Sequence, residues 1–509
     1  MNCALTTPHP LATQAGLDVL HQGGTAPEAL IAAGAVLTVV MPHFCGLGGD
    51  AVWLIADRHG RQTSFLALGQ AIDRPMPKGP FPQRGPGSVL TTAAVVSGWQ
   101  HAFCYAKDQL GGASRWDDLL TPAIDLAQDG FATSRSQAFW GEYRAQEAAT
   151  WPGFSGLFFH AGQPLKAGHH FRQTQLAQSL REVAENGAGA FYTGKLSARI
   201  VDGLRAAGVV ISPDDLEHTS TRECAPLQLR YHGLTLLAPP PPTQGVTTLQ
   251  IMGILAQFDL SSVEPGSADH FHICVEATKR AFLQRRQLGD TPEVMANISR
   301  WLSSDRLGAL YADISTETAM PWPDNWQHGD TVFLGAIDEY GNAASVLQST
   351  YFDWGSGVVV GDTGIIWQNR GAAFNNNPRH PNAFSPGKLP FYTLNPGIAL
   401  QDGRPKFVYG TQGADGQPQT LSMLLTRLIN FAQPAPDALA APRFLLGRTF
   451  SDVRDSLKLE ADTAPGTVAE LKRRGHEICL IPAQSPLAGQ AGVVTRHANS
   501  TFASHDPRE

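Results

Sequence analysis

The chain has 509 residues, of which 42% are hydrophobic and only 16% are charged, so it can bury a large core. Its net charge of −7 and the absence of any basic cluster with interleaved aromatic residues argue against a nucleic-acid-binding protein. No apolar run approaches the ~18 residues of a membrane span, and no secretory signal is visible at the start. Six cysteines stand singly, as reduced thiols do. We therefore expect a cytoplasmic protein that binds neither nucleic acid nor membrane.

The first predicted elements are two helices and a strand. Residues 11–22 have helical spacing and end at two glycines. Thr25 and Glu28 then form a capping box, in which the threonine accepts a hydrogen bond from a first-turn amide and the glutamate reaches back. The run ALIAAGAVLTVVM that follows is apolar on all sides, which indicates a buried helix. After the loop PHFCGLGGD, the sequence AVWLIAD predicts a strand.

Helices and strands then alternate along the rest of the chain. The predicted helices cover 98–110, 116–128, 174–186, 196–207, 268–286 and 418–430. The predicted strands cover 51–57, 87–92, 228–237, 331–337, 343–349, 358–367 and 406–410. This alternation favours mixed sheets covered by helices. The segment 372–391 has no periodicity and is rich in Asn, Pro and Gly, so we expect a long loop that could cover a site.

The triplet Gly-Asp-Thr occurs three times, in different local contexts. Thr291 precedes a proline and predicts a turn, and Thr363 precedes a glycine and predicts a turn that feeds a strand. Thr331 instead begins a predicted β-hairpin, in which VFLGAI and AASVLQS are joined by the turn DEYGN. Such a threonine is either a structural strand start or the new amino terminus of a self-cleaving hydrolase.

Three other motifs do not support a site. The sequence GLGGDA at 46–51 fits a relaxed dinucleotide-binding pattern, but a strand follows it where that motif requires a helix. A G-x-S-x-G elbow is absent, which weakens a serine α/β-hydrolase. Asp269, His270 and His272, or the pair His169 and His170, have no second cluster at ligand spacing, so we expect surface or capping roles. We expect no metal and no cofactor.

The Thr331 hypothesis has a chemical rationale. A threonine hydroxyl is a weak nucleophile, but a cut between Asp330 and Thr331 frees an α-amine on the same residue. Its reference pKa of ~7.7–8.0 lets it accept the hydroxyl proton at neutral pH. Acyl transfer also needs an oxyanion hole, and YGTQGADGQPQT at 409–420 offers backbone N–H groups at a sharp turn before a predicted helix.

The chain resembles the γ-glutamyltranspeptidase family of N-terminal nucleophile hydrolases nearly from end to end. The matching stretches include PLATQAGLDVLHQGGTAPEALIAAGAVLTVVMPHFCGLGGD, GAGAFYTGKLSARIVDGLRAAG, PPPPTQGVTTLQIMGIL, HFHICVEATKRAF, GDTVFLGAIDEYGNAASV, TLNPG, APRF and SHDPR. The resemblance implies an α+β fold, a four-layer αββα sandwich, and self-cleavage. It also implies a large chain, 1–330, and a small chain, 331–509, that stay intertwined.

Individual residues carry over from the family. Thr331 matches the nucleophile, and Ser349 matches the second hydroxyl, usually Thr, that orients and activates it. Gly413 and Ala414 match the Gly-Gly pair whose amides form the oxyanion hole. Ala414 keeps its N–H, so that role requires only an allowed backbone conformation.

The substrate pocket departs from the family pattern. The segment LALGQAIDRP at 66–75 lacks the family's glutamate-binding arginine, and Tyr351 replaces an asparagine. Ala373 replaces the acidic residue that holds the glutamyl amine, and Tyr392-Thr393 replace a Ser-Ser pair. Arg370 is a new cation where Gln or Glu is usual. Losing both anchors would disfavour γ-glutamyl binding by several kcal/mol.

From these features we expect an autoprocessed threonine amidohydrolase whose substrate is a small amide with a carboxylate facing Arg370. Oxamate, the substrate of relatives in purine and allantoin breakdown, fits best. The alternatives are a γ-glutamyl transpeptidase or glutathione hydrolase, a cephalosporin-type acylase, and an uncleaved binding or scaffold protein. Arg370 itself could also pair with a nearby acid or lie in solvent. A homodimer is left open as the oligomeric state.

Overall fold

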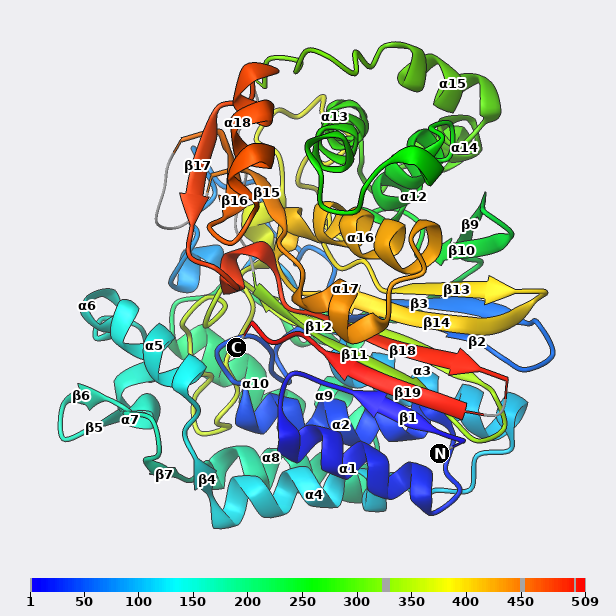
Figure 1. The fold of residues 1–509 in the computed structure, drawn as a ribbon. Helices are drawn as coiled ribbons and strands as arrows, with labels where there is room; N and C mark the ends of the chain where they lie inside the picture. Colours follow the sequence, from blue (N-terminus) through cyan, green and yellow to red (C-terminus); the bar gives the residue numbers. More distant parts are fainter. Residues whose placement is uncertain (1, 323–329, 449–453, 499, 509) are drawn as a thin grey trace.

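Two six-stranded antiparallel sheets lie face to face at the centre of the computed structural model, which describes residues 2–322, 330–448, 454–498 and 500–508. The first sheet has the strand order β1-β11-β12-β2-β3-β8 and the second the order β19-β18-β14-β13-β10-β9. Helices cover the outer face of each sheet (Figure 1). This arrangement confirms the predicted αββα sandwich.

The strands of the two sheets come from both halves of the sequence. The first sheet contains β1 (Ala4–Thr6), β2 (Asp50–Ala56), β3 (Gln62–Ala67), β8 (Arg222–Cys224), β11 (Asp330–Ile337) and β12 (Ala343–Tyr351). The second contains β9 (Leu227–Tyr231), β10 (Leu234–Ala238), β13 (Gly397–Gln401), β14 (Arg404–Thr411), β18 (Ala491–His497) and β19 (Ser500–His505). Segments before and after Thr331 thus contribute strands to both sheets, and in the first sheet they are interleaved.

The helical layers follow the two sheets. The first sheet is covered by α1 (Pro10–His21), α2 (Ala26–Val40), α3 (Val95–Tyr105), α4 (Trp116–Asp129), α8 (Thr174–Asn186), α9 (Gly189–Thr193) and α10 (Lys195–Ala206). The second is covered by α12 (Gly245–Leu255), α13 (Ala268–Arg285), α15 (Ser304–Ala312), α16 (Gln417–Leu425), α17 (Ala435–Ala440) and α18 (Pro465–Arg473). α14 (Pro292–Trp301) packs beside them in a separate small cluster. No helix in these described parts of the chain is long and apolar enough to cross a membrane.

Shorter elements lie at the periphery. They are α5 (Arg135–Tyr143), α6 (Ala145–Ala148), α7 (Phe154–Phe158), α11 (Pro213–Glu217), β4 (Phe131–Ala132), β5 (Phe159–His160), β6 (Gln163–Pro164), β7 (His170–Phe171), β15 (Phe444–Gly447), β16 (Ser456–Glu460) and β17 (Ile478–Ile481). Strands β15, β16 and β17 form a small third sheet, and the pairs β4–β7 and β5–β6 form two-stranded ribbons.

The predicted capping box and buried helix are confirmed in α2, every residue of which is buried. The Thr25 backbone N–H donates to Glu28 Oε2 at 2.7 Å, and the Thr25 hydroxyl accepts from the Glu28 amide. The Ala26 amide donates to Asp338 Oδ2 at 3.0 Å, and Asp338 Oδ1 also accepts from the Asn342 amide at 2.9 Å. Asp338 therefore joins the first turn of α2 to the turn of the β11–β12 hairpin.

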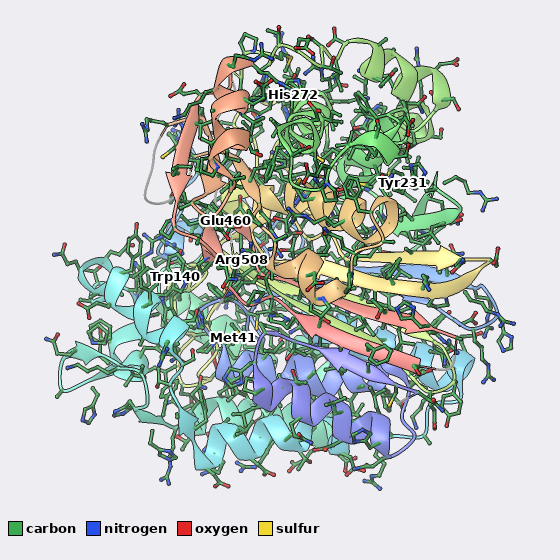
Figure 2. All side chains as sticks on the ribbon, viewed as in Figure 1. Met41, Trp140, Tyr231, His272, Glu460 and Arg508 are labelled. Carbon is green, nitrogen blue, oxygen red and sulfur yellow. The ribbon has the colours of Figure 1, made fainter. Side chains whose placement is uncertain are left out.

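Asp506 and Arg508 of the C-terminal motif SHDPR are buried at the edge of the second sheet. Arg508 pairs with Glu460 at 2.5 Å and with Asp506 at 3.0 Å, and Arg443 pairs with Asp506 at 2.6 Å. Figure 2 shows Arg508 and Glu460 close together near the centre of the molecule. Breaking one partner of such a buried network leaves an uncompensated charge, so this cluster fixes the chain end.

Two predicted strands are wrong, and a third is divided. Residues 87–92 begin in the 3₁₀ turn Pro86–Ser88 and then make only an isolated bridge. Residues 358–367 make only isolated bridges, between Val359 and Ile366 and between Trp367 and Gly48, because Gly361 and Gly364 have φ of 50° and 70° and reverse the backbone. Residues 228–237 form β9 and β10, separated by a turn.

Most of the other predicted elements agree with the structure. All predicted helices are present, and those at 98–110 and 418–430 end in the π-helical segments Ala106–Leu110 and Thr426–Asn430. The long loop predicted at 372–391 is confirmed from residue 374, since residues 372 and 373 end the 3₁₀ helix Arg370–Ala373. Thr291 is the N-cap of α14 and not a simple turn residue, because its hydroxyl accepts the Val294 amide. All six cysteines are free thiols.

Candidate functional site

Thr331 lies at an irregular point between the second and third strands of the first sheet. It belongs to β11, which pairs with β12 from Ile337 back to Val332, where Val332 lies opposite Gln348. The register then shifts, so that Asp330 lies opposite Tyr351. Thr331 sits at this β-bulge and is almost completely buried. Bulges are frequent next to active sites because they redirect a side chain from the regular pleat.

The stacking of the sheets brings the start of β11 toward the turn after β14. A Cβ added to Gly335 would lie 3.0 Å from Val408, and one added to Gly410 would lie 2.2 Å from Phe333. The two strands thus cross the interface in opposite directions. Two residues before Phe333 on β11 is Thr331, and two residues after Gly410 on β14 is residue 412. By this antiparallel crossing, Thr331 is directed toward the segment that begins at 412.

Two consecutive residues of that segment have left-handed backbones. Gly413 has φ of 111° and Ala414 has φ of 42°. Neither amide donates a hydrogen bond to a residue within the described ranges. An alanine in this region costs roughly 1–2 kcal/mol, which the surrounding contacts must offset. The pair therefore presents two adjacent N–H groups in a strained turn, the arrangement that an oxyanion requires.

A polar cluster holds this turn in place. Gln244, at the start of α12, donates through Nε2 to the carbonyls of Ala414 at 2.8 Å and Thr393 at 2.7 Å. Arg285, at the end of α13, donates to Gln244 Oε1 at 2.9 Å and pairs with Asp415 at 2.6 Å. Residues from three elements thus fix the Ala414 carbonyl, and with it the direction of the neighbouring N–H groups.

Ser349 and Asp50 are adjacent on the inner face of the first sheet. They are register partners across β12 and β2, and side chains alternate along each strand so that both face the second sheet. The Ser349 hydroxyl accepts the Tyr351 amide at 2.8 Å. A Cβ added to Gly49 would lie 2.5 Å from the Ser349 carbonyl oxygen, so the GLGGD loop needs glycine to pass this strand end.

Arg370 is buried between two aromatic rings. Its guanidinium carbon lies 3.7 Å from the ring centre of Tyr351 and 4.3 Å from that of Tyr392. Burial lowers its pKa from the ordinary value. No hydrogen-bond acceptor from the described residues reaches this guanidinium, and its Nε and Nη1 atoms are completely buried. Arg370 therefore neither pairs with an acid nor lies in solvent.

Tyr392 connects this group to Asp50. Its hydroxyl donates to Asp50 Oδ2 at 2.5 Å, while Oδ1 of Asp50 accepts the amides of Gly69 at 2.8 Å and Ala94 at 2.9 Å. Burial raises the pKa of Asp50 to about 6, although these hydrogen bonds act in the opposite direction. Asp50 thus fixes one wall of the Arg370 site. Thr393 follows Tyr392 and contributes its carbonyl to Gln244.

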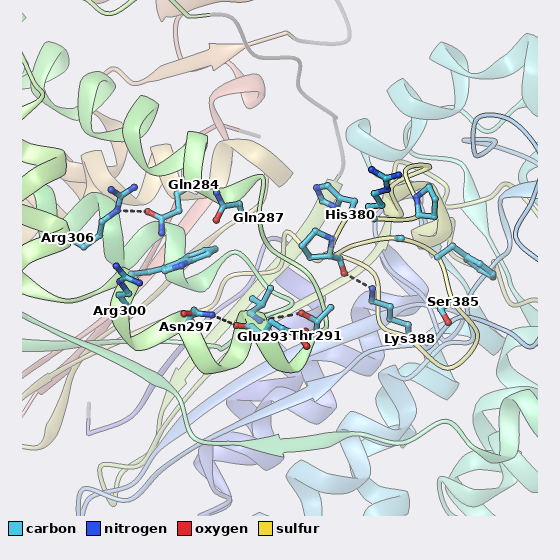
Figure 3. Close-up of a pocket in the computed structure, with 17 residues that line it drawn as sticks. Gln284, Gln287, Thr291, Glu293, Asn297, Arg300, Arg306, His380, Ser385 and Lys388 are labelled. Atoms are coloured by element: carbon cyan, nitrogen blue, oxygen red, sulfur yellow. Dashed lines mark hydrogen bonds between the residues drawn. The ribbon is translucent and has the colours of Figure 1, made fainter.

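A cavity of about 1070 Å³ lies between α13, α14, α15 and the loop 374–391 (Figure 3). Its described lining contains one carboxylate, Glu293, and four cations, which are Arg300, Arg306, Arg379 and Lys388. Gln284 also lines it and directly precedes Arg285 of the polar cluster. The lining of the cavity is therefore mainly positively charged.

The histidines of the rejected metal motifs have structural partners. His270 lies 2.8 Å from the Thr426 hydroxyl, and Asp269 pairs with Arg474 at 2.5 Å. His272 forms a buried group with Glu276 and His476 at potential metal-ligand distance. Glu276, however, already pairs with Lys279 at 2.7 Å and with Arg280. The positive charges of Lys279 and Arg280 at Glu276 disfavour a metal ion in this group.

Sequence reasoning did not identify Asp50, Gln244, Arg285 or Asp415 as part of this region. Asp50 had a usable signal, since a carboxylate opens an otherwise apolar strand directly after GLGG. Gln244 and Arg285 had no such signal. Apart from each other, their hydrogen-bond and ion-pair partners lie more than a hundred residues away in the sequence.

The αββα sandwich, with a threonine at the start of a central strand, defines the architecture of N-terminal nucleophile hydrolases. Residues 12–509 match the Gamma-glutamyltranspeptidase family, and the chain belongs to that family. It is 41% identical to the oxamate amidohydrolase proenzyme of Klebsiella pneumoniae, over 98% of this chain and 96% of the relative. It is 35% identical to the glutathione hydrolase-like YwrD proenzyme of Bacillus subtilis, over 96% and 94% of the two chains.

Solved structures support the same assignment. The cephalosporin acylase of Bacillus halodurans superimposes with a TM-score of 0.91 at 27% identity, covering 100% of this chain and 94% of that one. The γ-glutamyltranspeptidase of Helicobacter pylori, at 24% identity, shares the fold over 62% of this chain and 93% of its own, with a TM-score of 0.58.

The raised pKa of Asp50 leads to a stability prediction. Between pH ~4 and ~6 the folded protein retains a proton that the unfolded chain has lost, so the free energy of unfolding falls as pH rises through this window. A shift of ~2 pKa units corresponds to about 3 kcal/mol. Urea titrations measure the free energy of unfolding of wild type and of Asp50→Asn at each pH. The wild-type value minus the Asp50→Asn value should fall by about this amount between pH 4 and 6.5. A difference that does not vary with pH would contradict it.

Proposed function

We propose that this protein is an autoprocessed amidohydrolase that hydrolyses a small amide carrying a carboxylate, such as oxamate. Thr331 is the nucleophile, and the chain is cut before it into fragments 1–330 and 331–509. The observation that carries the substrate class is the buried Arg370 guanidinium, which lies within hydrogen-bonding reach of no described acceptor. A buried cation of this kind is stabilised when an anion binds to it.

The similar proteins support this proposal. The Klebsiella pneumoniae relative is an oxamate amidohydrolase, and both curated relatives are named proenzymes. The cations that line the cavity favour the approach of an anionic substrate. Interleaving of the segments before and after Thr331 would hold the two fragments together after the cut.

In the first step the Thr331 hydroxyl attacks the Asp330 carbonyl carbon. The Asp330–Thr331 peptide bond breaks, and an ester forms that water hydrolyses to give the Asp330 carboxylate and the free Thr331 amine. In each turnover that amine accepts the hydroxyl proton as the oxygen attacks the substrate amide. The amides of Gly413 and Ala414 stabilise the oxyanion, ammonia leaves, and water releases the acid.

The remaining residues of the site bind the substrate and orient the nucleophile. Arg370 holds the substrate carboxylate with the planar fork of its guanidinium, whose geometry a carboxylate matches. Ser349 and Thr350 lie opposite Thr331 in the bulge, and Ser349 orients the Thr331 hydroxyl. Tyr351, Tyr392 and Thr393 surround the acyl group in place of the family's polar glutamyl-binding residues. A γ-glutamyl substrate would leave its amine unpaired next to Ala373, which disfavours glutathione chemistry.

Processing can be tested directly. Purified protein should run as fragments of 330 and 179 residues (509 − 330 = 179), and the smaller should begin Thr-Val-Phe-Leu on end sequencing. Thr331→Ala should remain one chain, because the attacking hydroxyl is gone. A Thr331→Ala protein still cut at the same bond would exclude self-cleavage, and a wild type that stays intact would favour an uncleaved binding relative.

Ser349→Ala should slow both maturation and turnover by on the order of 10²-fold, as expected for a positioned hydrogen-bonding group. The substitution leaves the buried Tyr351 amide without this acceptor, so the thermal midpoint should fall by a few degrees while the protein stays folded. Time courses of cleavage and of ammonia release measure the two rates. Unchanged rates would show that Ser349 has only a structural role at the strand end.

Arg370→Met should lower kcat/KM for oxamate by about 10²- to 10³-fold, because charge-assisted hydrogen bonds to the carboxylate are lost. Self-cleavage should persist, since it needs no substrate. Arg404→Met, on the exposed start of β14, is the matched control and should leave both reactions unchanged. An equal loss for oxamate and for its neutral diamide analogue would assign Arg370 a structural role.

A further inference from the structure

The two tyrosines beside Arg370 restrict how a ligand can reach it. Tyr351 leaves β12 with φ of 84°, and Tyr392 is held by its hydrogen bond to Asp50. Both ring centres lie within about van der Waals distance of the guanidinium carbon. The guanidinium carbon lies over both rings, and a cation over an aromatic face has that side of its charge covered. An acceptor would therefore reach the planar group through its edge, where the N–H groups point.

An acceptor at that edge shares the plane of the guanidinium. A carboxylate joined directly to an amide carbonyl is a chain of trigonal atoms that can lie flat, so it can extend from the edge between the aromatic walls. A tetrahedral carbon between carboxylate and amide places substituents above and below that plane, where the ring of Tyr351 lies. It also moves the amide carbon about one bond length further from the guanidinium.

We propose that Tyr351, Arg370 and Tyr392 form a flat aromatic slot that selects amides whose carboxylate is bonded directly to the amide carbonyl. The two tyrosines are its specificity-determining residues. This inference deepens the proposed function and rests on it. Asp50 is a positioning residue of the slot, since it acts on the guanidinium only through the ring of Tyr392.

The position of the slot fits this role. Tyr351 is the register partner of Asp330, the residue before the nucleophile, and its amide donates to Ser349. A substrate held at the edge of Arg370 is therefore held next to the proposed reacting group. A short acyl chain suffices to span the distance, whereas the family's glutamyl group needs room for an α-carbon and its amine.

The first test compares substrates on the cut wild-type enzyme. Ammonia release is measured with oxamate, with malonamate, which inserts one CH₂, and with 2,2-dimethylmalonamate, which thickens that carbon. We expect kcat/KM to fall at least about 10²-fold from oxamate to malonamate and further for the dimethyl compound. Equal values for oxamate and malonamate would overturn the slot but leave the proposed function standing. No ammonia release from any small anionic amide would overturn both the slot and the proposed function.

The second test changes the walls. Tyr351→Leu keeps apolar volume but loses the flat ring, so the oxamate-to-malonamate preference should fall below about 10-fold, mainly through faster malonamate hydrolysis. Tyr340→Leu, in the exposed turn between β11 and β12, is the control, because it makes the same substitution away from the slot, and its preference should stay within about 3-fold of wild type. Self-cleavage reports folding of both variants. A Tyr351→Leu enzyme that cleaves itself and keeps the wild-type preference would overturn the slot.

Discussion

The pairing of β11 with β12 in the middle of the first sheet is the constraint on which the site depends. At one end of this hairpin, Asp338 is bonded to the first turn of the buried helix α2. At the other end, the bulge sets Thr331 against the end of β12, where Ser349 and Tyr351 lie. Because the hairpin also packs across β14, the same pairing aligns the start of β11 with the left-handed turn at Gly413.

The buried charge of Arg370 is the second determinant, and the magnitudes show that it is not a stabilising feature. Removing a guanidinium from water costs several kcal/mol even after relaxation. Contacts with aromatic rings return about 2 kcal/mol when desolvated. The protein therefore keeps a group that costs stability in the absence of a ligand, which is typical of a site that binds an anion. The strained backbones of Tyr351 and Ala414 lie in the same region.

Local sequence determined the elements whose signals lie within a few residues. The capping box of Thr25 and Glu28 and the apolar run after it predicted α2 correctly, because both effects act within one or two helical turns. Alternating strand formers around DEYGN predicted the hairpin and hence the place of Thr331. Periodicity failed at 358–367, where two glycines with left-handed φ reverse a run of strand-forming residues.

Only the tertiary structure decided what surrounds the nucleophile. The sequence indicated Arg370 as a new cation but left open an acid partner or exposure to solvent; burial between Tyr351 and Tyr392 excludes both within the described chain. The hydrogen bond between Asp50 and Tyr392 joins residues 342 positions apart. No local pattern encodes such a contact, because it arises from the stacking of two sheets and not from the conformation of either segment.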